Sequence, residues 1–174
     1  MDGIVAAEWY RSAQTREVAD LAKPESLMLL SMRWWVRCYS QQECALERLI
    51  QGMRRGGAPD AAYSVNGLMW VVARTGQRPV DIRCPRCPSL SDDEAILLHA
   101  AWLAQEARSD LAERYLRAHL LTEAGAVFAI GPLEGLGNLF LAAGLSFGRR
   151  RIATEPTDAQ PRWEMPDDCS RTVH

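Results

Sequence analysis

The segment CPRC at residues 84–87 carries the side chains best suited to chemistry in this sequence. Two thiolates separated by two residues can bind one tetrahedral zinc ion, but a complete structural site needs two further ligands. The preceding helices offer Cys38 and Cys44, and a later helix offers His99. The sequence has no second CxxC pair and no histidine pair with zinc-finger spacing. One hypothesis is therefore a zinc site in which Cys84 and Cys87 are joined by Cys38 and Cys44.

Two other interpretations of the same cysteine pair stay open. A redox-active pair needs a thiolate that a helix N-terminus activates, whereas here the next helix opens only at Ser91, beyond Pro88. A thioredoxin-like protein also needs a βαβ pattern, which this sequence lacks. The simplest interpretation is that the two thiols lie in a proline-stiffened loop with no metal and no redox role. A Cys87–His99 hydrolase is not predicted, because no orienting third group or oxyanion motif accompanies the pair.

Two groups of residues suggest binding to a partner instead. Trp34 and Trp35 are adjacent, and adjacent helix positions point about 100° apart. We predict that one of these rings lines a groove or a partner surface, where aromatic side chains contribute much of the binding energy. The alternative is a central helix that is buried on several sides. Arg149, Arg150 and Arg151 could contact an acidic partner or nucleic acid, although so short a run is also typical of a solvated tail.

Apolar residues at helical spacing dominate the chain and indicate an all-α fold. We expect a single-domain, orthogonal or irregular bundle of six or seven helices. A Pro/Cys-rich loop at residues 77–90 separates its three N-terminal helices from a C-terminal hairpin. Capping boxes at residues 40–43 and 91–94 predict two helix starts, the alternative at the first being that the preceding helix continues through it with a bend. Gly56-Gly57 predicts a helix end, and Gly131-Pro132 predicts a break. The expected helices begin near residues 3, 24, 41, 59, 92, 111 and 123.

Several charged side chains have structural explanations. Arg33 and Arg37 are four residues apart and are expected to form a polar strip on an otherwise apolar helix. Asp92, Asp93 and Glu94 resemble a cation-binding cluster. However, acidic residues in the first turn of a helix are stabilised by its dipole, which explains all three without an ion.

The composition is that of a folded globular protein. Its 174 residues are 48 % hydrophobic and 24 % charged, with a formal net charge of −2, which excludes wholesale disorder and a strong field toward nucleic acid. We expect a helical domain over residues 1–147 and a flexible polar tail over 148–174, which has few apolar residues to bury. The start of the sequence has no positively charged segment before an apolar run, so no secretory signal is predicted. Charge, glycine and proline interrupt the apolar stretch 124–145, so no membrane span is predicted.

The lack of a complete catalytic constellation in the sequence favours a non-enzymatic role. We predict a small bacterial adaptor or regulatory protein that binds another protein and is compatible with homo-oligomers, with neither nucleic acid nor membrane as its partner. An odd number of cysteines without a secretory signal places it in the reducing cytoplasm. The alternative is a metal-binding module with structural zinc, or a thiol-redox module, centred on the CPRC loop. A third is an enzyme whose site assembles from residues distant in sequence.

Overall fold

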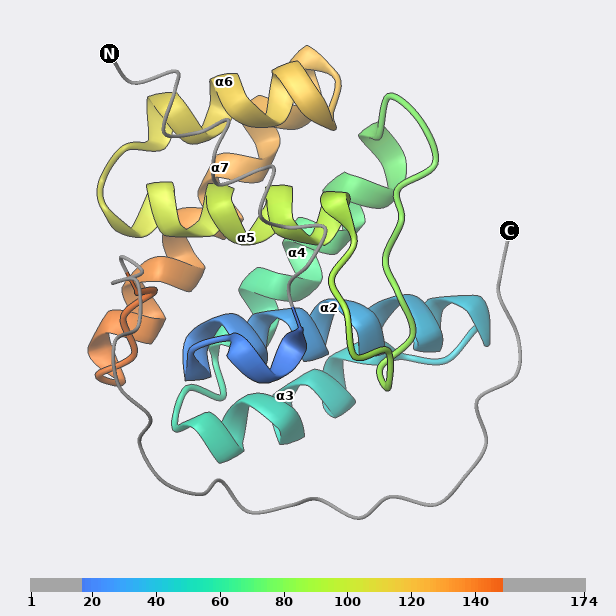
Figure 1. Ribbon diagram of the computed structural model, residues 1–174, viewed down its shortest axis with the longest axis vertical. Helices are drawn as coiled ribbons and strands as arrows, with labels where there is room; N and C mark the ends of the chain where they lie inside the picture. The colour runs from blue at the N-terminus through green and yellow to red at the C-terminus, as the bar shows by residue number, and fades with distance from the viewer. Residues whose placement is uncertain (1–16, 149–174) are drawn as a thin grey trace.

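The computed structural model describes residues 17–148, and within them the protein is entirely helical (Figure 1). This confirms the predicted all-α fold, since the described residues contain six α-helices, one short 3₁₀ helix and no strand. Most of the expected helix from residue 3 lies outside the described residues, as do residues 149–174 of the expected tail, Arg149, Arg150 and Arg151 among them. The elements are η2 (Val18–Asp20), α2 (Lys23–Ser40), α3 (Ala45–Gly56), α4 (Ala61–Thr75), α5 (Asp92–Gln105), α6 (Ser109–His119) and α7 (Glu123–Ala142).

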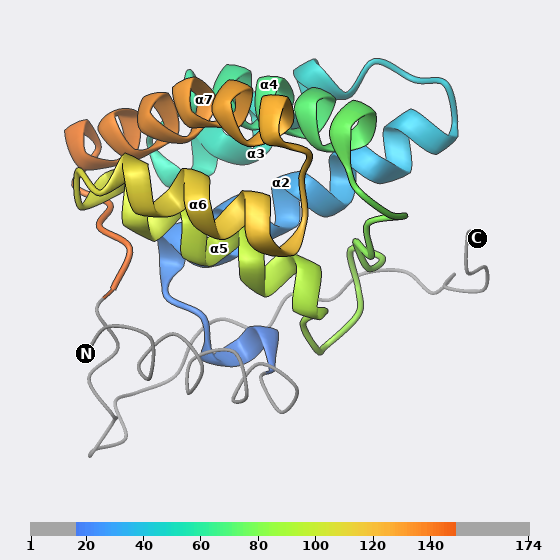
Figure 2. The same cartoon turned by 90° about the horizontal axis from the view of Figure 1, so that it is seen from above.

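The helices form two groups that α4 and α7 join. Helix α2 packs against α3, α4 and α5, while α7 packs against α4, α5 and α6. In Figure 1 the α2–α3 pair lies at one end and the α5–α6 hairpin at the other, and α4 and α7 cross behind them; Figure 2 shows the same arrangement from above. The core between them is apolar and includes the fully buried Met28, Leu68, Leu97 and Phe140. The loop that separates α4 from α5 is thus free to run across the outside of the bundle.

Most of the helix ends follow the sequence signals. Ser91 Oγ accepts a hydrogen bond from the Glu94 N–H at 3.1 Å, and the Glu94 carboxylate accepts one from the Ser91 N–H at 2.9 Å. This reciprocal pair is the predicted capping box of α5. Gly57 follows α3 with φ +86°, the left-handed conformation that glycine adopts at low cost. The predicted end of α3 is therefore confirmed.

The predicted capping box at residues 40–43 is wrong. Ser40 Oγ does not cap a new helix but donates to the Arg37 carbonyl at 2.8 Å. The chain then turns through Gln42, whose φ is +59°, and α3 begins only at Ala45. Because the left-handed residue lies inside the supposed box, the reciprocal geometry cannot form there.

The predicted break at Pro132 is also wrong, since α7 is continuous from Glu123 to Ala142. An interior proline costs a helix about 3 kcal/mol. Here packing compensates, because the Pro132 ring lies against α4: a Cβ added at Gly67 would lie 3.6 Å from Pro132 Cγ. Within the described residues α7 is also the one helix with the length and apolar composition to cross a membrane. Its Leu133 and Leu136 are fully buried in the bundle, whereas Val127, Phe128 and Leu141 of the same helix are exposed.

Candidate functional site

The loop between α4 and α5 is held to the rest of the fold at both ends and in the middle. At its start, the Gln77 N–H donates to the Leu120 carbonyl at 3.0 Å, and the Gln77 side-chain amide donates to the Leu121 carbonyl at 2.6 Å. The Thr122 N–H in turn donates to the Thr75 carbonyl at 2.9 Å. These bonds tie the beginning of the loop to the connection between α6 and α7.

Asp93, in the first turn of α5, holds the middle of the loop. Its carboxylate accepts hydrogen bonds from both terminal nitrogens of Arg78, at 2.7 and 2.5 Å, and from the Asp81 N–H at 2.7 Å. The Asp93 side chain is 2 % exposed, whereas that of Arg78 is 49 % exposed. A two-pronged pairing of this kind fixes orientation as well as distance. Asp93 thus anchors residues 78–81 and does not form part of a cation site.

Glu94 holds the end of the loop through a buried ion pair with Arg33 of α2. The Arg33 guanidinium donates to both Glu94 oxygens, at 2.7 and 2.8 Å, and both side chains are fully buried. It also donates to the carbonyls of Cys87 and Ser89, at 2.6 and 2.9 Å. Glu94 additionally accepts the Arg83 N–H at 3.0 Å. One arginine therefore connects α2, the helix start of α5 and the cysteine segment.

The predicted polar strip of Arg33 and Arg37 does not form, because Arg33 points into the core. Only Arg37 is exposed, and Arg33 is 1 % exposed. A buried charge is tolerated when a partner and hydrogen bonds satisfy it, and Arg33 has both. Asp93 and Glu94 do more than interact with the helix dipole, because each has a specific arginine partner.

The CPRC segment is a tight turn at the surface. The Cys87 N–H donates to the Cys84 carbonyl at 3.0 Å, and the Arg33 guanidinium donates to the Cys87 carbonyl. Cys84 is exposed and Cys87 is half-buried. The two cysteines thus stand on a backbone whose conformation is fixed by bonds to α2.

The four-cysteine zinc site is not assembled. Cys38 is buried in the core, and burial followed by the charge of Glu43 raises the pKa of its thiol. Cys44 is exposed just before α3. No group of three or more His, Cys, Asp or Glu side chains among residues 17–148 is arranged to hold a metal ion. The structure therefore does not bring Cys38 and Cys44 together with Cys84 and Cys87 as predicted, because Cys38 packs in the core and Cys44 lies exposed at the start of α3.

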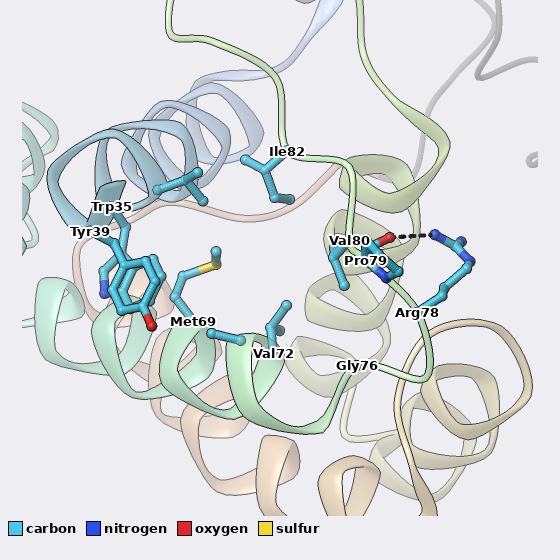
Figure 3. Close-up of a pocket in the computed structure, with 11 residues that line it drawn as sticks. Trp35, Tyr39, Met69, Val72, Gly76, Arg78, Pro79, Val80 and Ile82 are labelled. Atoms are coloured by element: carbon cyan, nitrogen blue, oxygen red, sulfur yellow. Dashed lines mark hydrogen bonds between the residues drawn. The ribbon is translucent and has the colours of Figure 1, made fainter. Parts of the chain in front are cut away.

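A groove of about 450 Å³, lined mostly by apolar side chains, lies between α2, α4 and the loop that follows α4. Figure 3 shows its two sides: Trp35 and Tyr39 from α2 with Met69 and Val72 from α4, facing the loop residues between Gly76 and Ile82. We call this the α2–α4 groove. Its lining residues are Trp35, Val36, Tyr39, Met69, Val72, Ala73, Gly76, Arg78, Pro79, Val80 and Ile82.

Aromatic stacking makes the α2 side of the groove rigid. The rings of Trp35 and Tyr39 stack with centroids 4.9 Å apart, and Trp70 meets both rings edge-on at 5.4 and 5.6 Å. Trp35 Nε1 donates to the Asn66 side-chain oxygen at 3.0 Å, so its one polar atom is satisfied. Trp35 is 3 % exposed, but Tyr39 is 53 % exposed and presents its ring to solvent. Such offset and edge-on pairs add about 0.5–1.5 kcal/mol each beyond burial.

Trp34 lies away from this groove. The guanidinium groups of Arg37 and Arg48 stand over its ring at 5.5 and 4.0 Å from the centroid. Both arginines are exposed, so Trp34 is covered by cation–π contacts at the surface. The structure thus separates the adjacent tryptophans as their angular spacing required, and Trp35 is the one that lines a groove.

His99 lies outside the groove, on α5, and is 8 % exposed. Its ring contacts those of Trp102 and Tyr115, with centroids 5.3 and 4.8 Å apart. Burial, together with the charge of Arg108, lowers the pKa of His99 to about 4. The imidazole is therefore neutral at neutral pH, as expected of a core histidine.

Sequence reasoning missed most of the groove. Tyr39, Met69, Val80 and Ile82 drew no functional prediction, because each fits a helix face or a loop when it is considered alone. One signal was present: Val80 and Ile82 alternate with polar residues in a proline-rich loop, where apolar side chains need something to cover them. They cover the ends of α2 and α4 and so form the opposite wall.

Comparison with protein-family models, with curated proteins and with solved structures finds no match to this chain.

Proposed function

We propose that this protein is a small cytoplasmic adaptor or regulatory protein that binds a segment of another protein in the α2–α4 groove. The observation that carries the proposal is the groove itself: an apolar hollow of about 450 Å³ with a rigid aromatic wall and a half-exposed tyrosine at its mouth. Exposed aromatic side chains above a packed apolar floor are the usual anchors of protein recognition.

The groove has the volume to receive two or three apolar side chains of a partner. Its floor contains Met69 and Val72, which are almost completely buried. The surrounding core therefore already holds these side chains in place. Met69 gives the floor an adaptable surface that suits apolar partners of differing shape. The ion pairs of Asp93 and Glu94 hold the opposite wall in place. Binding therefore costs little conformational entropy in this loop.

The charges near the groove favour a partner with an acidic residue beside its apolar side chains. Arg78 lines the groove, and Arg74 stands over the Trp70 ring at 4.9 Å from the centroid. Trp70 contacts both aromatic residues of the groove wall, Trp35 and Tyr39. Only the Trp70 side chain therefore separates the Arg74 charge from the groove wall. A carboxylate on the partner would set the direction in which the segment binds.

A catalytic role has less support. The second hollow, about 340 Å³, is polar, but its best-buried acid, Asp93, is already paired with Arg78. His99, whose pKa is lowered to about 4 mainly by burial, lines neither hollow. An acid–base site needs such groups to converge in one cavity.

A matched pair of tyrosines tests the proposal. Tyr39 is 53 % exposed at the groove, and Tyr63 is 57 % exposed on α4 but does not line the groove. We expect Tyr39→Ser to weaken co-purification of the partner by about 5- to 30-fold, the loss of about 1–2 kcal/mol typical of an interface tyrosine. Tyr63→Ser should leave it unchanged. Equal recovery of the partner by both variants would contradict the proposal.

A further inference from the structure

We propose that Cys84 and Cys87 form a reversible thiol–disulfide pair, which exchanges two electrons with a low-molecular-weight disulfide such as oxidised glutathione. Ser89 is the positioning residue that supports the sulfur of Cys87. All three residues lie in the described loop between α4 and α5. None of them lines the α2–α4 groove, so this role does not depend on the function proposed for the groove.

The turn brings the two cysteines within reach of a disulfide bond. The Cys87 N–H donates to the Cys84 carbonyl at 3.0 Å, and Pro85 and Arg86 occupy the two central positions of the turn. A β-turn places its first and fourth Cα atoms less than about 7 Å apart. Disulfide bonds join cysteines whose Cα atoms are about 4.4–6.8 Å apart. The bond can therefore form with at most a small adjustment of the turn.

The two thiols differ in exposure, which gives each a separate role in the exchange. Cys84 is exposed, so a soluble disulfide can reach its sulfur. Cys87 is half-buried and is therefore less accessible to an external reagent. Cys84 is thus the thiol that reacts with the external disulfide, and Cys87 is the thiol that completes the intrachain bond.

Two side chains support the sulfur of Cys87. Cys87 Sγ lies 3.9 Å from Ser89 Oγ, within hydrogen-bonding distance for sulfur. The Arg83 guanidinium donates to the same hydroxyl oxygen, so the hydroxyl hydrogen remains available to the sulfur. A hydroxyl that donates to sulfur stabilises negative charge on it, and Cys87 carries that charge when it leaves during reduction of the disulfide. Ser89 thus supplies support that a helix N-terminus gives in other redox-active pairs.

The fold orders the turn before any disulfide forms. Arg33 donates to the carbonyls of Cys87 and Ser89 at 2.6 and 2.9 Å, and Glu94 accepts the Arg83 N–H at 3.0 Å. All three bonds involve backbone atoms, so a bond between the cysteine side chains does not require any of them to break. Because the turn is preformed, each thiol has a higher effective concentration toward the other than in the unfolded chain. The folded protein should therefore favour the disulfide more than the unfolded chain does.

The exchange has two steps, and its atoms and electrons balance. The Cys84 thiolate attacks one sulfur of the external disulfide, which forms a mixed disulfide at Cys84 and releases one external thiolate. The Cys87 thiolate then attacks the Cys84 sulfur, which forms the Cys84–Cys87 bond and releases the second external thiolate. The two cysteine protons pass through solvent to the released thiolates. The cysteines together lose two electrons, which reduce one external disulfide to two thiols.

Equilibration of the full chain in glutathione buffers of defined thiol-to-disulfide ratio, followed by acid quenching, alkylation and mass spectrometry, tests the proposal. We expect one two-electron transition in which a Cys84–Cys87 disulfide replaces both free thiols. In concentrated urea the equilibrium should shift toward the thiols by about 10-fold, because unfolding removes the preformed turn. The control Cys44→Ser removes an exposed thiol outside the pair and should leave the transition unchanged.

Two variants separate the roles of the side chains. In Cys87→Ser, glutathione should stay attached to Cys84 as a mixed disulfide, because the second attack is lost. In Ser89→Ala, the intrachain disulfide should still form. Its reduction by dithiothreitol should be slower by about 2- to 10-fold, the effect of one lost hydrogen bond to the leaving sulfur.

Three results would overturn the proposal. The first is that both cysteines stay reduced in the most oxidising buffer, or that glutathione stays on Cys84 in the unmodified chain. The second is the same equilibrium in concentrated urea as in the folded protein, which would show that the fold contributes nothing to the pair. The third is an unchanged rate of reduction in Ser89→Ala, with circular dichroism showing that the variant is folded, which would remove Ser89 from the site.

Discussion

Replacement of Arg33 by Met is the most informative single perturbation of this fold. The change keeps a long apolar stem but removes a guanidinium that makes four hydrogen bonds, two to Glu94 and one each to the carbonyls of Cys87 and Ser89. Removal of one partner from a buried ion pair typically costs 3–5 kcal/mol, because the remaining charge stays buried.

The expected size of the effect follows from what Glu94 keeps. Its carboxylate still accepts the Arg83 and Ser91 N–H groups, at 3.0 and 2.9 Å, which lessens the penalty. The carbonyls of Cys87 and Ser89 lie in half-buried residues, where water can replace the lost donors. We therefore expect a loss of about 4 kcal/mol in the free energy of unfolding. For a chain of this size, that loss corresponds to a decrease of about 8–16 °C in Tm.

The assay is thermal unfolding by circular dichroism, together with the rate at which Cys87 reacts with a thiol reagent under native conditions. That rate should rise in Arg33→Met because the turn loses its anchor. Arg37→Met, one helical turn further along α2 at an exposed position, is the control and should lose no more than about 1 kcal/mol, the size of its exposed cation–π contact with Trp34. Arg33→Lys keeps the charge but loses the planar guanidinium that donates to both Glu94 oxygens. Its Tm should therefore lie between those of the unmodified protein and Arg33→Met. A Tm for Arg33→Met within about 2 °C of the control would refute this reasoning.

Two further predictions concern stability. His99 has its pKa lowered to about 4 by burial and by Arg108, while the unfolded chain titrates near 6.5. As the pH falls from 6.5 to 4 only the unfolded chain gains this proton, so the free energy of unfolding should decrease by about 3 kcal/mol more than in His99→Gln, measured by urea unfolding at several pH values. In α7, Gly137→Ala should destabilise by about 1–3 kcal/mol, because the new Cβ would lie 3.1 Å from Gln105 Cα. In α3, Gly52→Ala meets nothing within 4 Å and should stabilise by about 0.5–1 kcal/mol in the same urea assay; the reverse order of the two glycine variants would contradict the packing described here.

The helices were predictable wherever a local signal agreed with the packing. The Ser91–Glu94 box and the Gly57 stop act within one turn of backbone, and both appear where the sequence placed them. The equally good box at residues 40–43 failed because a left-handed residue at Gln42 reverses the chain there. Pro132 failed as a helix breaker for a different reason, since its ring packs on Gly67 of another helix. At Pro132, therefore, an interaction between distant parts of the chain decided the outcome.

The site was predictable only in part. The angular spacing of Trp34 and Trp35 correctly indicated that their environments differ. The role of Arg33 was not predicted, because arginine is rarely buried and its partner Glu94 lies 61 residues away in the sequence. The α2–α4 groove depends on where a loop crosses two helices, and no short pattern in the sequence encodes that crossing.

Site-specific photo-crosslinking in the native host tests the central claim most directly. A photoreactive phenylalanine analogue replaces Tyr39 at the groove or, in the matched control, Tyr63 on α4. We expect a discrete adduct from position 39 that is absent from position 63. The crosslinked partner segment should carry apolar residues beside a carboxylate, and as a synthetic peptide it should bind the unmodified protein and bind Tyr39→Ser more weakly. Identical adducts from both positions, or a peptide that binds Tyr39→Ser with unchanged affinity, would contradict the assignment of the groove as the binding site.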